Sequence, residues 1–192
     1  MKLISLNIEG NKHFERVKPF LIEENPDVIC LMEVPEAFSI FLQNHGYYVS
    51  FAPMTKKQIS NECFLEGIMM AAKSKLSHLT HYYHHPAPDI ITFDKERMFE
   101  TLNHPVILAE IDSFNIATTH FVWNPSASNP FEPQAIALDK MLAFLKVQPP
   151  HILCGDMNIP RHKSPYSKAL MSHYSDAIPE EYGSSLDRAY HR

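Results

Sequence analysis

The stretch His151–Asn158 places a carboxylate and an amide two residues apart, directly after an apolar run. Asp156 and Asn158 follow the apolar segment 152–154 and Gly155. Side chains at positions i and i+2 of a strand share one face, and an anionic oxygen beside an amide suits a hard cation or a phosphate. Gly, Asp and Asn are also common turn residues, so this stretch alone favours an ordinary loop.

Polar side chains stand in the same relation to three other apolar runs. Asn7 and His120 end two short β-rich segments, and Glu33 lies near the end of the run Asp27–Val34. Such runs predict strands. A carboxylate in so apolar a run must be paired, bind a cation or emerge at the sheet edge, so a metal ligand and a solvated edge glutamate fit Glu33 equally well. Taken together, the four strand ends suggest one shared rim at which a metal and a phosphate could be held.

The remaining patterns predict elements that could position this rim. Alternation of helices and strands is expected in the first half of the chain, then a strand-rich stretch, and then a long helix before Asp156. Residues 55–62 and 124–133 are polar and are predicted to be loops, where we expect substrate specificity to lie. Strands are predicted near residues 2–8, 27–34, 47–53, 64–72, 75–85, 106–111, 115–120 and 151–158, and helices near 11–25, 35–46, 132–146 and 165–174.

Composition sets limits on the class of protein. The chain has 192 residues, 45% hydrophobic and 20% charged, so one domain over residues 1–192 is expected. A net charge of −5 disfavours a large nucleic-acid footprint but leaves room for a small phosphate-bearing substrate. No membrane span or signal-peptide pattern is visible, so a cytoplasmic location is expected. The three cysteines lie in or beside apolar runs and are predicted to be buried free thiols.

Several short motifs, in their order along the chain, resemble the endonuclease/exonuclease/phosphatase superfamily, which has the DNase-like fold. The resemblance covers nearly the whole chain, and the ordered set is more specific than any one motif. It implies an α/β (α+β) fold: a four-layer α-β-β-α sandwich with two mixed β-sheets face to face and helices outside. The motifs are Ser5-Leu6-Asn7-Ile8, Leu31-Met32-Glu33-Val34, Glu66-Gly67-Ile68-Met69-Met70, Thr118-Thr119-His120-Phe121 and Gly155-Asp156-Met157-Asn158.

The resemblance also implies a role for each polar strand end. Glu33 would bind Mg²⁺ (or Mn²⁺), and Asn7 would help to shape the same site. His120 would contact the scissile phosphate, Asp156 would activate the attacking water, and Asn158 would hold the phosphate or the aspartate. The implied reaction is metal-dependent hydrolysis of a phosphoester by in-line attack of water.

Arg97, Trp123 and Arg161 are expected to contact the substrate, which would be a nucleic acid or a small phosphodiester. A phosphodiesterase or nuclease fits the motifs best. A phosphatase or phosphodiesterase acting on a small molecule or a lipid headgroup is the alternative, and a non-catalytic binding domain of the same fold is a third. Retention of all five polar groups favours the enzymes, since a decayed site has no physical need for them.

One departure from the family pattern concerns the C-terminal Ser-Asp-His motif, which is not visible here. We therefore expect the last strands to be missing and this polypeptide to be weakly active or inactive. Asp187 resembles the family's penultimate aspartate, but the sequence places it more naturally in a loop before that strand. His191 has no Ser-Asp before it and is not assigned the terminal histidine's role.

Overall fold

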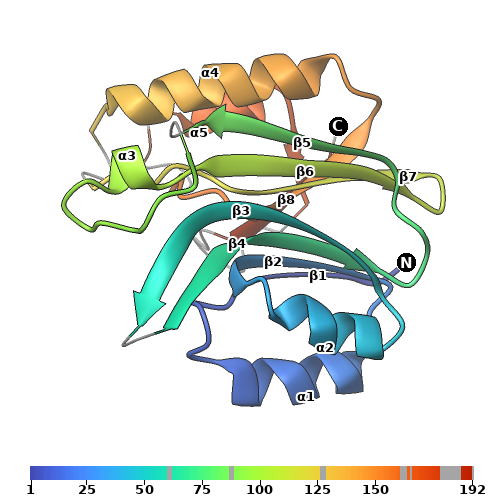
Figure 1. The fold of residues 1–192 in the computed structure, drawn as a ribbon. Helices are drawn as coiled ribbons and strands as arrows, with labels where there is room; N and C mark the ends of the chain where they lie inside the picture. The colour runs from blue at the N-terminus through green and yellow to red at the C-terminus, as the bar shows by residue number, and fades with distance from the viewer. Residues whose placement is uncertain are drawn as a thin grey trace.

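Two β-sheets lie face to face in the computed structural model, with helices on the outer face of each (Figure 1). The structure describes residues 1–59, 62–86, 89–125, 129–160, 164, 166–177 and the backbone of 187–191. The first sheet has the strand order β1-β2-β4-β3 and the second β5-β6-β7-β8-β10-β9. The strands are β1 (Leu3–Asn7), β2 (Val28–Pro35), β3 (Tyr48–Ile59), β4 (Glu62–Ala72), β5 (Ser77–His85), β6 (His104–Ile111), β7 (Phe114–His120), β8 (His151–Asp156), β9 (Ser175–Asp176) and β10 (Asp187–His191).

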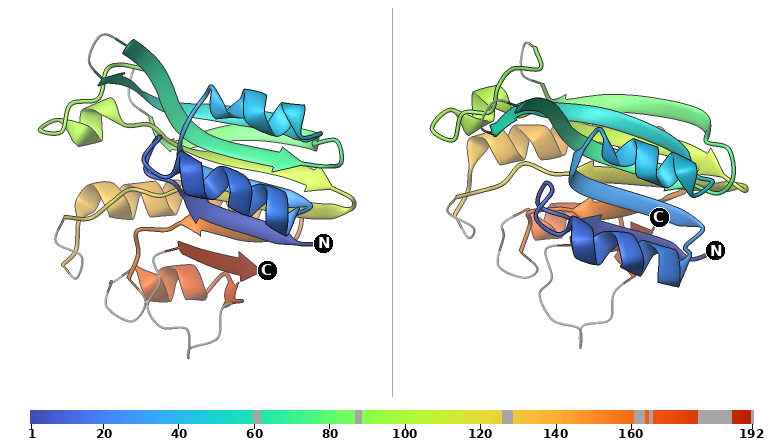
Figure 2. Two further views of the ribbon diagram at one scale, coloured as in Figure 1. Left: turned by 90° about the horizontal axis from the view of Figure 1, so that it is seen from below. Right: turned by 60° about the horizontal axis from the view of Figure 1, so that its bottom comes forward.

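The helices form the two outer layers. Figures 1 and 2 show α1 and α2 on the outer face of the first sheet, and α4 with α5 on the outer face of the second. The short helix α3 lies at one end of the sandwich (Figure 1). No helix in the described ranges is both long and apolar enough to cross a membrane. The helices are α1 (Phe14–Glu24), α2 (Phe38–Asn44), α3 (Met98–Thr101), α4 (Glu132–Lys146) and α5 (Ser167–Met171).

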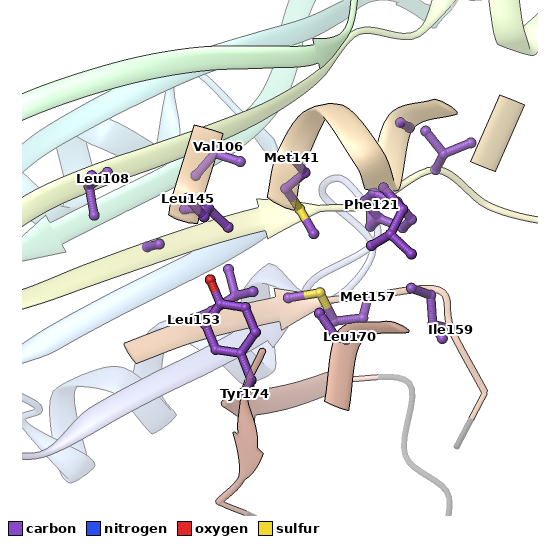
Figure 3. Close-up of a cluster of buried hydrophobic side chains, with 14 residues drawn as sticks. Val106, Leu108, Phe121, Met141, Leu145, Leu153, Met157, Ile159, Leu170 and Tyr174 are labelled. Carbon is purple, nitrogen blue, oxygen red and sulfur yellow. The ribbon is translucent and has the colours of Figure 1, made fainter. Parts of the chain in front are cut away.

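Three layers of buried apolar side chains join the four layers of the sandwich. One lies between the sheets and combines residues such as Met32 and Ile107. Another lies under α1 and α2. The third joins the second sheet to α4 and α5, and Figure 3 shows Met141 and Leu145 gathered with Leu153 and the other side chains of this core. Because the sheets are mixed and both are covered on two faces, the predicted α-β-β-α sandwich is confirmed.

Local sequence explains why the elements of the rim form. The helix α1 ends where Asn25 adopts a left-handed conformation and donates its N–H to the Leu21 carbonyl, and Pro26 follows at once. The run Val28–Met32 is fully buried because helices cover one face of β2 and the second sheet covers the other. That two-sided burial is the physical reason for its continuous apolar sequence.

Three expectations from the sequence were wrong. Residues 55–59 are not loop but the end of β3, and β4 begins at Glu62. They belong to a two-stranded hairpin that projects beyond the sandwich (Figure 1), in which the backbone is paired, Lys56 and Gln58 are exposed and Thr55 is buried. Asp187 is not in a loop, because it opens β10, which pairs antiparallel with β8. Cys63 is exposed, whereas the other two cysteines are buried as predicted.

Candidate active site

The four polar strand ends meet at one edge of the sandwich. Strands β1 and β2 are parallel, and so are β7 and β8, so the carboxyl ends within each pair lie at the same edge. The register places His120 directly beside Asp156. The facing sheet brings Asn7 and Glu33 to the same place, so the rim inferred from the sequence exists as a physical cluster.

The side-chain amide of Asn7 joins the two sheets. Its Nδ2 donates to Glu33 Oε1 at 2.9 Å and to Asp156 Oδ2 at 3.1 Å. Its Oδ1 accepts the backbone N–H of Glu9 at 3.1 Å, which fixes the orientation of the amide. Two carboxylates from different sheets therefore converge on one neutral donor. Such a convergence of negative charge is costly unless a cation or protons balance it.

The imidazole of His120 faces both carboxylates. Its Nε2 lies 3.8 Å from Glu33 Oε1 and 3.7 Å from Asp156 Oδ2. These separations exceed hydrogen-bond length and leave the ring able to approach a substrate oxygen. Its Nδ1 is buried and has no hydrogen-bond partner among the described residues.

The strand ends that carry the carboxylates have unusual backbone conformations. Glu33 has φ +51° and Asn158 has φ +47°, in the left-handed region. A register shift between Leu31 and Val34 accompanies the Glu33 conformation. Left-handed non-glycine residues cost about 1–3 kcal/mol and persist where the surroundings impose them. Here the distortion turns Glu33 out of the alternation of β2 and into the cluster.

Asn158 supports Asp156 through its backbone. Its N–H donates to Asp156 Oδ1 at 3.0 Å, while its side-chain Nδ2 donates to the Phe121 carbonyl at 2.8 Å. Asp156 is 8% exposed, and each of its carboxylate oxygens accepts a hydrogen bond from a residue of fixed position. The carboxylate therefore holds one orientation toward the cluster.

Glu66 is a third carboxylate beside this site, and the sequence named it only as part of the motif Glu66–Met70, without a role. It is 7% exposed, and its Oε1 lies 3.3 Å from Lys57 Nζ. Burial raises the pKa of the Glu66 carboxyl above its ordinary value; the Lys57 charge opposes this rise and Glu33 adds to it. A signal was available, since Glu66 directly precedes the apolar half of β4, just as Glu33 lies in the apolar run of β2. Lys57 was hidden because its segment was predicted to be a loop.

These groups open into a cavity of about 230 Å³. Glu33, Asp156, Asn158, His120 and Glu66 supply polar groups to its lining, and the rest of the lining is mostly apolar. A separate hollow of about 450 Å³ lies beside α1 and reaches Asn7, but neither Glu33 nor Asp156 lines it. The smaller cavity is therefore the one that combines space with reactive side chains.

Of the three residues expected to contact substrate, one lines the cavity, one does not, and one lies outside the described residues. Trp123 lines the cavity. Arg97 does not, and its guanidinium pairs with Glu100 at the solvent-exposed start of α3. Arg161 lies outside the described residues. Asp187 is placed by its backbone register directly beside Asp156.

His104 packs behind the polar rim and was not expected there. Its Nδ1 donates to the backbone carbonyl of His120 at 2.7 Å, and its ring lies edge-on to the His120 ring. Burial lowers the pKa of His104 to about 3, and the charge of His120 adds to that effect. His104 is therefore a neutral imidazole whose bond helps to fix the end of β7.

This depressed pKa predicts acid sensitivity. The unfolded chain binds a proton on His104 near pH 6.5, whereas the folded chain binds it only near pH 3. Stability is therefore lost as pH falls through this window. The variant His104→Asn keeps a donor for the His120 carbonyl but has no group that titrates in this window. Between pH 7 and pH 4 we expect its free energy of unfolding to fall by about 2–3 kcal/mol less than that of the wild type. Denaturant unfolding at both pH values measures this, and equal losses in the two proteins would contradict it.

Comparison with known proteins identifies relatives of this architecture. A model of the Endonuclease/Exonuclease/phosphatase family matches residues 4–192. The human Nocturnin catalytic domain with bound sulfate is 16% identical with a TM-score of 0.70, covering 100% of this chain and 82% of that one.

Two further structures extend the comparison. An AP endonuclease from Archaeoglobus fulgidus is 16% identical and a 3′-5′ exonuclease from Neisseria meningitidis is 14% identical. Each has a TM-score of 0.64 and covers 100% of this chain and 86% of the other. At these identities the likeness shows a shared fold. No curated protein sequence was found to match the chain.

Proposed function

The chain belongs to the endonuclease/exonuclease/phosphatase family, and on that premise we propose that it is a metal-dependent phosphodiesterase that hydrolyses its substrate through in-line attack by water. The observation that carries this proposal is the meeting of Glu33, Asp156 and His120 around the amide of Asn7. Two carboxylates and an imidazole in one cavity lining form a set that can hold a cation, orient water and contact a phosphate.

The donor set fits Mg²⁺ (or Mn²⁺). Within the described ranges, no three His, Cys, Asp or Glu side chains form a ready-made metal cage. Mg²⁺ does not need one, because it commonly binds through one or two carboxylates, retained waters and substrate phosphate. Glu33 would hold the ion, with Asn7 fixing its carboxylate. When bound, the ion would balance charge on the phosphoryl oxygens.

The protein groups have distinct tasks in the proposed reaction. Asp156 accepts the proton of the attacking water, since hydrogen bonds from Asn7 and Asn158 hold its carboxylate in one orientation. His120 donates from Nε2 to a phosphate oxygen. Its backbone is fixed by the bond from His104, so the ring approaches the phosphate from a defined direction.

The substrate we propose is a phosphodiester of a nucleic-acid end or nucleotide. The similar structures named above include an AP endonuclease and a 3′-5′ exonuclease, which supports nucleotide chemistry. The net charge of −5 favours a small ligand over a long duplex footprint. A small-molecule phosphodiesterase is the second candidate for the same reason.

Metal binding is expected to depend on Glu33. We expect Mg²⁺ to raise the thermal midpoint of the wild-type chain, since a ligand at a hundred times its Kd stabilises the folded state by about 2.7 kcal/mol. Glu33→Gln should lose this rise, because it removes the charged metal ligand while leaving the amide network nearly isosteric. Thermal unfolding over a titration of MgCl₂ or MnCl₂ is the measurement.

Glu23→Gln is the matched control for this experiment, because Glu23 is exposed on α1, away from the cavity. Hydrolysis of bis(p-nitrophenyl) phosphate with and without EDTA tests the reaction itself. An equal Mg²⁺ response in the Glu33→Gln and Glu23→Gln chains would refute the assigned metal site, and EDTA-resistant hydrolysis would refute metal dependence.

A further inference from the structure

Six apolar side chains of the cavity lining are not used by the proposed hydrolysis. We call the part of the cavity that they line the apolar lobe. Its side chains come from β3, from the connection between β5 and β6, and from the residues after β7. They are Met54, Phe93, Met98, Phe99, Leu102 and Trp123.

The wall of the lobe is held in place by backbone hydrogen bonds to β3. Lys56 N–H donates to the Ile91 carbonyl at 2.9 Å, and Phe93 N–H donates to the Lys56 carbonyl at 2.7 Å. Farther along, Asn103 N–H donates to the Met54 carbonyl at 2.9 Å. The segment that carries Phe93 and α3 is thus tied at both ends, so the lobe is preformed.

His104 presents a hydrogen-bond acceptor to this cavity. Its Nδ1 must carry the proton, because it donates to the His120 carbonyl, and the neutral ring therefore has a lone pair on Nε2. His104 lines the cavity. Its Nε2 has no hydrogen-bond partner among the described residues. Unlike Nδ1 of His120, this unpaired nitrogen is not fully buried. The nitrogen can therefore accept from a ligand.

Lys57 is the single cationic side chain in the described lining of the cavity, and its charge already has two partners. Lys57 Nζ lies 4.1 Å from the centroid of the Phe93 ring and 3.3 Å from Glu66 Oε1. Its charge is thus shared between a carboxylate and an aromatic face. The lobe consequently favours an uncharged group with apolar faces over a second phosphate.

We propose that the apolar lobe binds one nucleobase of the substrate, an uncharged planar ring with an N–H that donates to His104 Nε2. This inference rests on the proposed function and narrows its substrate to a phosphoester that carries an unstacked base. Aromatic and methionine side chains form good contacts with a flat ring. The cavity of about 230 Å³ is smaller than the roughly 300–1,000 Å³ of drug-sized pockets, which suits a single ring system.

Two other occupants fit less well. A lipid chain is flexible and would leave the His104 acceptor without a donor. A phenol ring linked to phosphate through its oxygen has the right shape but no N–H. The experiment therefore compares a base, a bare sugar phosphate and a phenyl phosphate.

Trp123 offers a direct readout, because it is the only tryptophan in the chain, lines the lobe and is 45% exposed. Its fluorescence is titrated with 3′-AMP and 5′-AMP in EDTA, so that no turnover occurs. We expect saturable quenching by at least one AMP and none by ribose 5-phosphate. His104→Asn should weaken AMP binding about fivefold, the value of one hydrogen bond.

His45→Asn is the matched control, because His45 Nδ1 also bonds to a backbone carbonyl, that of Phe41, but lies at the C-cap of α2. Equal quenching by phenyl phosphate, or equal AMP affinity in the two histidine variants, would overturn the nucleobase assignment. Absence of AMP quenching with the Glu33-dependent Mg²⁺ response intact would overturn the lobe proposal alone. AMP quenching without that response would instead overturn the metal-dependent function.

Discussion

Replacing Asp156 with asparagine is expected to lower the rate of phosphodiester hydrolysis about a thousandfold, within the range for loss of a general base. The carboxylate accepts hydrogen bonds from Asn7 Nδ2 and from the Asn158 N–H, one on each oxygen. Asparagine has one acceptor oxygen, so its NH₂ would face one of these donors and could not take a proton from water. Initial rates with bis(p-nitrophenyl) phosphate and saturating Mg²⁺ measure the effect.

The Asp156→Asn protein is expected to fold, so its lower rate would report the loss of the base and not a loss of stability. Asp139→Asn makes the same chemical change at an exposed position of α4 and should leave the rate unaltered. Because the rates of the variants are compared with that of the wild-type chain, the ratio does not depend on how fast the wild type is. A drop of less than tenfold in a folded Asp156→Asn protein would remove Asp156 from the role of base.

The polar rim could be predicted because each of its residues belongs to a strand with a clear local pattern. Asn7, Glu33, His120 and Asp156 each follow an apolar run, and parallel pairing makes such ends meet. Ordered similarity to one superfamily then indicated two sheets face to face, and the structure shows that the two pairs lie on facing sheets. Local pattern and family order were together sufficient for this part of the site.

The apolar lobe could not be predicted from local pattern. It depends on contacts between β3 and a connection some forty residues later in the chain, for example the bond from Asn103 N–H to the Met54 carbonyl. Lys57 and its neighbours read as loop because the segment is polar on both faces of the strand, although, of its described side chains, only Lys56 and Gln58 are exposed and Thr55 is buried. The burial of His104 likewise results from packing against His120, and no periodic pattern in the sequence around His104 predicts it.

Gly155→Ala is expected to destabilise the folded chain by about 4 kcal/mol or more, a large part of the roughly 5–15 kcal/mol that stabilises a typical domain. A Cβ at this position would lie 2.0 Å from the Thr119 carbonyl oxygen, and the backbone has φ +130°. Gly155 and Thr119 are register partners directly next to the His120–Asp156 pair. Relief of the clash requires β7 and β8 to separate, which breaks buried ladder hydrogen bonds.

Gly46→Ala separates the two causes of this loss. Gly46 also has a positive φ, +84°, but no atom lies within 4 Å of a Cβ added there. It should therefore lose only the conformational term, about 1–2 kcal/mol. Soluble folded yield and the urea midpoint of both variants are the measurements. If Gly155→Ala unfolded at the same urea concentration as Gly46→Ala, close approach of β7 and β8 would not be what requires glycine. The expected difference would instead mean that this approach, which sets His120 beside Asp156, depends on the absence of one methyl group.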